Sequence, residues 1–244
     1  YTVATKLLGE RVGVVSGCAL LVDYVLTVTI SIASAGDQLF SVLSHLTGST
    51  DIQAFKFAAE VVFLLLLMLL NLRGVKESVI ALAPIFLIFI LSHLVLIVGG
   101  LIFHVGDADD RARELSQEFH TGLRTIGWGG MALIFLRAFS LGGGTYTGIE
   151  AVSNSMPILR EPHVKTGKAT MRYMAVSLAF VASGLIVCYL LFRVTPDPSA
   201  DPHRRMAMNF LLAQEFFGPS AVGGLMIAIT VLSEGGLLVV GGQA

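Results

Sequence analysis

The chain has 244 residues, of which 55% are hydrophobic and 14% are charged, and its formal net charge is −1. Soluble domains carry about 25% charged residues, so this composition excludes an ordinary soluble enzyme as well as a disordered or fibrous chain. A net charge close to zero also excludes a global positive field that would attract nucleic acid.

The hydrophobic residues fall into six blocks, each about long enough to cross a hydrocarbon core of roughly 30 Å. Lipid offers the backbone no hydrogen-bond partners, so each block is expected to form a helix. In chain order the predicted spans cover about residues 12–40, 57–72, 79–103, 128–156, 174–192 and 210–240. We therefore expect an all-α polytopic membrane protein. Because the sequence stops beside an apolar stretch, we treat residues 1–244 as a single incomplete transmembrane domain of a longer protein.

The first predicted span carries a stripe of polar residues on an otherwise apolar helix. At 100° per residue the stripe is about 100° wide. Its members are Ser16, Asp23, Tyr24, Thr27, Ser31 and Ser34. A seam between packed helices would explain the hydroxyl groups. A charged residue near mid-membrane costs about 2.5–3.5 kcal/mol, however, so Asp23 favours an ion or proton path.

The fourth predicted span contains a glycine-rich segment at residues 142–148. Each interior glycine weakens a helix by about 1 kcal/mol relative to alanine, so we expect the helix to be broken there. Broken helices at mid-membrane form substrate sites in many secondary transporters. Thr145 and Thr147 add hydroxyl oxygens, and Glu150 adds a carboxylate just beyond the break. Close helix packing would also explain the glycines, but it leaves Glu150 without a role.

The connecting loops give an orientation. Lys and Arg number eight on the side that holds residues 1–11, 71–77 and 157–172, against seven on the other side. The short, dense basic loops favour that side as cytoplasmic, which would place both ends of this fragment in the cytoplasm. On the other side, residues 105–123 are expected to form a polar external loop, partly helical.

Two further polar residues lie in predicted spans. Glu234, in the last span, is a secondary candidate for a proton relay, although it could equally bond to a neighbouring helix or lie near the wet end. His93 is interpreted as a packing residue. The sequence contains no arrangement typical of an enzyme active site, so we expect neither catalysis nor a cofactor.

Three stretches of the sequence carry a resemblance to a known family. They are residues 8–27, which begin with LGE and end with LLVDYVLT, LNLRG at 70–74 and TGIEAVSN at 147–154. These stretches resemble permeases of the amino acid–polyamine–organocation (APC) superfamily, in the branch of KimA-like potassium importers. The resemblance implies a LeuT-type inverted-repeat fold of about twelve helices. The six spans would then be helices three to eight, with the broken sixth helix at residues 128–156.

The resemblance also implies a site. K⁺ would be bound by Asp23, Thr27, Ser31 and Thr147, with Tyr24, Gly144 and Thr145 lining the same pocket and Ser34 as a secondary candidate. Glu150 or Asp23 would carry the coupling proton. The implied activity is proton-coupled potassium uptake across the cell membrane by alternating access.

Two alternatives stay open. In the first, the substrate is an amino acid and Asp23 faces its amine. In the second, the chain is a non-transporting membrane sensor or scaffold subunit. Lipid is the expected environment, no nucleic-acid partner is expected, and a homodimer is one assembly to consider.

Overall fold

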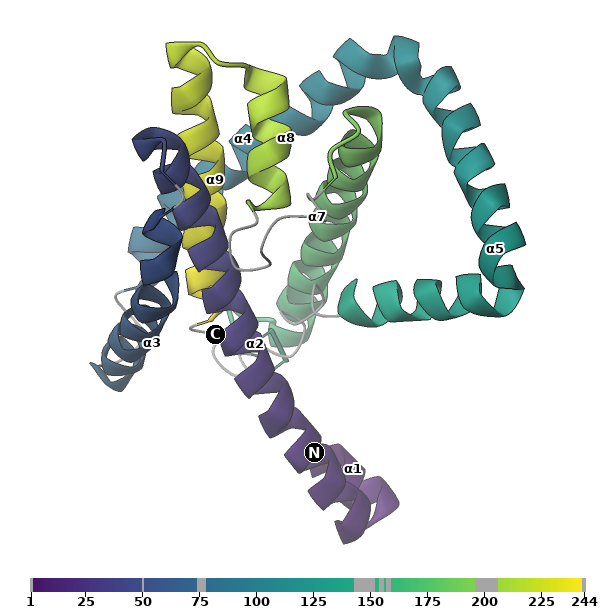
Figure 1. The fold of residues 1–244 in the computed structure, drawn as a ribbon. Coiled ribbons are helices and arrows are strands. Elements are labelled where there is room, and N and C mark those ends of the chain that lie inside the picture. The colour runs from purple at the N-terminus through teal and green to yellow at the C-terminus, as the bar shows by residue number, and fades with distance from the viewer. Residues whose placement is uncertain are drawn as a thin grey trace.

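The computed structural model describes residues 2–49, 51–73, 78–142, 152–153, 156, 159–195 and 206–242. Throughout these residues the regular structure is helical, which confirms the all-α prediction (Figure 1). The α-helices are α1 (Thr2–Leu8), α2 (Glu10–Thr47), α3 (Lys56–Arg73), α4 (Ser78–His104), α5 (Ala108–Gly142), α7 (His163–Leu191), α8 (Met208–Phe217) and α9 (Ala221–Gly241). Two 3₁₀ helices, η1 (Asp51–Phe55) and η3 (Val105–Asp107), precede α3 and α5.

Four stretches of the described chain are long and apolar enough to cross a membrane: Glu10–Thr47, Ala83–Gly142, His163–Leu191 and Ala221–Gly241. The protein is therefore a multi-pass membrane protein. Helix α3 overlaps the second predicted span. Three of its 18 residues are charged, namely Lys56, Glu60 and Arg73.

The last predicted span, residues 210–240, is wrong as a single helix, because the structure divides it into α8 and α9. Gly218, with φ of 70°, ends α8 in the left-handed region that glycine adopts without strain. Ser220 then caps α9 by accepting a hydrogen bond from the Gly223 N–H at 3.0 Å. The Gly218-Pro219-Ser220 sequence is a turn signal that the apolar residues on either side obscured.

The expected external loop at 105–123 is largely helical, since it forms η3 and the first part of α5. Within α5 the chain changes direction at Gly127, whose φ is 69°. The predicted start of the fourth span at Trp128 thus coincides with a bend. Near its start, α5 is joined to the end of α7, because Arg193 donates to Glu114 at 2.6 Å and Arg111 donates to the Leu190 carbonyl at 2.7 Å.

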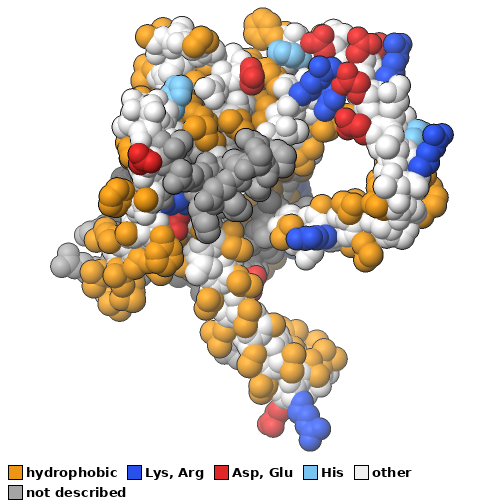
Figure 2. Space-filling view, viewed as in Figure 1, with side chains coloured by type: hydrophobic (Ala, Val, Ile, Leu, Met, Phe, Trp, Pro, Cys, Tyr) orange, Lys and Arg blue, Asp and Glu red, His pale blue; other side chains and the backbone are white. Residues whose placement is uncertain are grey.

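The core lies where α9 packs against α2, α4 and α8, with α7 beside α4. One buried cluster joins α4, α7 and α8 through Leu96, Ile97, Leu185, Cys188, Val194 and Leu212. A second joins α2, α8 and α9 through Val42, Phe210, Ala213, Ile227 and Val231. The N-terminal half of α2 projects away from these clusters (Figure 1), and Figure 2 shows exposed hydrophobic side chains over this half and over α3.

Candidate functional site

The polar stripe of α2 is partly covered in the structure. Tyr24, Thr27, Ser31 and Ser34 are half-buried, whereas Asp23 is exposed. Apolar side chains on other faces of the same segment are more open, and Leu21, for example, is 67% exposed. The hydroxyl-bearing members of the stripe are therefore more covered than these apolar side chains, and Asp23 is not.

The structure places Ser31 against α9. A Cβ atom built on Gly241 would lie 3.8 Å from the Ser31 hydroxyl oxygen. Asp23 lies eight residues closer to the N-terminus, which is about 12 Å along an α-helix. The stripe thus begins in the contact between α2 and α9 and extends along α2 beyond it.

The other half of the predicted site is not described. Gly144, Thr145, Thr147 and Glu150, together with the predicted break after Gly142, lie outside the described residues. Their placement opposite Asp23 and Thr27 stays a prediction.

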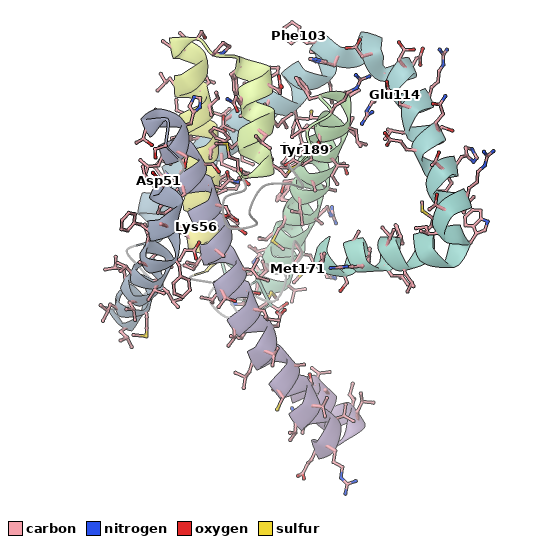
Figure 3. All side chains as sticks on the ribbon, viewed as in Figure 1. Asp51, Lys56, Phe103, Glu114, Met171 and Tyr189 are labelled. Atoms are coloured by element: carbon pink, nitrogen blue, oxygen red, sulfur yellow. The ribbon has the colours of Figure 1, made fainter. Side chains whose placement is uncertain are left out.

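A second polar group, which the sequence did not reveal, lies in the core. His93 of α4 is fully buried, and its Nε2 atom lies 3.8 Å from Oε2 of Glu234 on α9. The other carboxylate oxygen of Glu234 accepts a hydrogen bond from the Asn209 side chain of α8 at 2.6 Å. The Tyr189 hydroxyl of α7 donates to the same Asn209 side chain, and Tyr189 lies between α7 and α8 in Figure 3.

These contacts refine two predictions. Glu234 bonds to a neighbouring helix, which is one of the alternatives given for it above. The neighbour is α8. His93 does pack, with its ring centroid 4.0 Å from that of Phe89, but it also faces a carboxylate. No spacing could have joined His93 to Glu234, since the pairing depends on how α4 and α9 pack.

A third polar group lies between α2 and the start of α3 (Figure 3). Lys56 contacts the Asp37 carboxylate and lies 3.8 Å from that of Glu60. The helices approach closely here, because a Cβ atom at Gly36 would lie 2.4 Å from Glu60 Oε1. The single positive charge of Lys56 offsets one of the two carboxylate charges, and its contact with Asp37 is an ion pair that joins α2 to α3.

Comparison with known proteins identifies the family. The sequence matches the amino acid permease family over residues 1–240. The chain belongs to this family. Its members are transport proteins and not enzymes, in agreement with the absence of a catalytic motif from the sequence. The permease fold expected from the resemblance is consistent with the helices described above.

One relative of this chain is the potassium transporter KimA of Bacillus subtilis (strain 168). The two sequences are 35% identical over 200 residues, which cover 81% of this chain and 31% of the relative. The chain therefore spans about a third of the length of the curated relative that it matches. No solved structure matches the chain.

Proposed function

We propose that the complete protein is a secondary active transporter that takes up K⁺ together with H⁺ across the cell membrane. The observation that carries this proposal is the oxygen-bearing stripe of α2, in which Asp23, Thr27 and Ser31 follow one another at intervals of four residues. Residues four apart lie on one side of a helix, so the three side chains line the same side of α2. The relative is named as a potassium transporter, which supports the same substrate.

The chemistry of the stripe suits a cation that must lose its water. The hydroxyl oxygens of Thr27 and Ser31 and the Asp23 carboxylate are hard donors, which replace a hydration shell. Thr147 and backbone carbonyls near residues 142–148 would complete the shell from the other side. Glu150 or Asp23 would take up and release the coupling proton, since an ionisable group inside a membrane commonly marks such a path.

The family supports a second candidate function. Its description, amino acid permease, favours an amino acid as the substrate. In that case Asp23 would pair with the substrate amine, and N–H groups exposed at the break after Gly142 would bind the carboxylate.

Uptake by the full-length protein distinguishes the candidates. Expressed in a strain that lacks its own potassium importers, the protein is expected to restore growth at limiting K⁺ and to carry K⁺ faster when the external pH is lowered. An excess of mixed amino acids should not slow this uptake. Saturable amino acid uptake without K⁺ flux would favour the second candidate, and no flux of either solute would favour a sensor or scaffold.

The proposed orientation places the start of α2 and the loop before α7 in the cytoplasm. In a cysteine-free background, Asp110→Cys on α5, at a side chain that is 79% exposed, should react with a membrane-impermeant maleimide in intact cells. Lys168→Cys, at an exposed position on α7, should react after permeabilisation alone. The reverse pattern would invert the orientation.

A further inference from the structure

The buried group formed by His93, Glu234, Asn209 and Tyr189 includes none of the residues proposed above to bind K⁺. Its four residues come from four helices, α4, α9, α8 and α7, and its hydrogen bonds converge on the N-terminal end of α8. The α2 stripe, by contrast, contacts α9 near Gly241. The group is therefore a separate ionisable site in the core.

The contacts of His93 indicate which of its two ring nitrogens carries the proton in the neutral form. Its Nδ1 atom lies 3.0 Å from the Phe89 carbonyl oxygen, which can only accept a hydrogen bond. The nearby Ser92 hydroxyl donates to the same carbonyl at 3.1 Å. The His93 proton is thus held on Nδ1, and in the neutral ring Nε2 carries a lone pair.

That lone pair faces a second acceptor. Nε2 of His93 and Oε2 of Glu234 are both buried, and neither has a hydrogen-bond partner among the described residues. With no proton between them, a buried carboxylate faces a lone pair, which is costly. With two protons, the Glu234 carboxyl group is neutral, so the buried imidazolium of His93 has no counter-charge. One shared proton offsets both penalties, because it makes an imidazolium that pairs with the Glu234 carboxylate across 3.8 Å.

The second carboxylate oxygen links this proton to α8. The Asn209 side chain donates to it at 2.6 Å and accepts from Tyr189, so both ends of the amide are held. Asn209 and the adjacent Phe210 are buried at the start of α8. A cavity of about 500 Å³ borders α8, and its lining includes His45, Arg193 and Glu215. Asn209 therefore ties the start of α8 to the Glu234 carboxylate.

Other ionisable groups near the pair are few in the described chain. From α7, Tyr189 faces Glu234 through Asn209, and the Cys188 thiol contacts the Ile97 carbonyl at 3.8 Å. Helix α2 presents the neutral Gln38 beside Gly235. Asp37 of α2 is paired with Lys56.

We propose that His93 and Glu234 form a one-proton binding site that holds α8 against α4, α7 and α9. Proton loss leaves two buried acceptors facing each other, and the free energy that seats α8 then decreases. The seated state binds this one proton more tightly than the released state does, so the free energy that seats α8 decreases as the pH rises through the range in which the proton is lost. The inference holds whichever solute the protein carries.

Hydrogen–deuterium exchange of the full-length protein in detergent micelles tests this site. Exchange of residues 208–217 is measured across a pH series, corrected for the intrinsic exchange rate and compared with residues 163–180 of α7 as an internal reference. For a site that releases one proton, protection of α8 should fall tenfold per pH unit over the range of deprotonation. Protection that does not change with pH, relative to α7, would overturn the proposal.

Two substitutions locate the proton. Glu234→Gln provides an amide that can donate to His93 and still accept from Asn209, so α8 should stay protected at every pH. His93→Gln places a fixed donor opposite Glu234, and it too should abolish the pH dependence. Ser233→Ala is the matched control, because the Ser233 hydroxyl bonds within its own helix, to the Thr230 carbonyl at 2.8 Å. A wild-type slope in either Gln variant would assign the proton elsewhere and overturn the proposal.

Discussion

Replacing Asp23 with asparagine in the full-length protein is expected to reduce K⁺ uptake by about 100-fold at limiting K⁺. Asparagine keeps the size and one oxygen of the side chain but removes the negative charge that offsets the charge of the ion. A bond to a charged group contributes about 1.5–3 kcal/mol, and the upper value corresponds to a factor of about 100. Initial rates in proteoliposomes measure the effect, and uptake at the wild-type rate would contradict the proposed site.

Two threonines of α2 give a matched comparison for the same site. Thr27 lies in the stripe and is half-buried, whereas Thr29 is exposed and its hydroxyl donates to the Val25 carbonyl of its own helix at 2.8 Å. Thr27→Val is expected to lower uptake by about tenfold, as the loss of one ligand oxygen would. Thr29→Val should leave uptake unchanged. Equal losses in both variants would indicate a general effect on the helix.

Replacing Phe210 with alanine is expected to destabilise the protein by about 3–5 kcal/mol. The Phe210 side chain is fully buried and joins α8 to α2 and α9. Its ring centroid lies 5.5 Å from that of His45, near the end of α2. Removing the ring would leave a cavity that three separate helices must relax to fill. Equilibrium unfolding in mild detergent measures the change in free energy.

Phe103 is the control for Phe210. It lies at the end of α4 and is 76% exposed, so Phe103→Ala removes little packing (Figure 3). A change of less than about 0.5 kcal/mol is expected for such a surface position. If Phe210→Ala changed stability no more than Phe103→Ala, α8 would not pack against α2 and α9 as the structure shows.

Predictions that rest on apolar length were the most successful. Blocks of about twenty apolar residues indicate helices, because lipid leaves the backbone no other way to satisfy its hydrogen bonds. The same criterion failed at residues 210–240, where Gly218 and Pro219 divide one apolar block into α8 and α9. Local turn chemistry overrode hydropathy there, and the dipeptide was a signal available in the sequence.

Predictions about single polar residues depended on where the partner lies. The α2 stripe could be inferred because its members share one helix face, so the 3.6-residue period is enough to group them. The partners of His93 and Glu234 could not be inferred, since they lie on other helices at distant positions in the chain. Asp37 was missed for the same reason, because its partner Lys56 belongs to α3.

The amino-acid sequence by itself therefore determined the membrane environment, the helical fold and the polar face of α2, because each follows from side-chain solubility and helical periodicity within one segment. Tertiary structure alone decided which buried polar groups meet. Helix packing brings His93, Glu234 and Asn209 together from α4, α9 and α8. Contacts of this kind depend on the angles and distances between helices, which no periodicity within a single helix encodes.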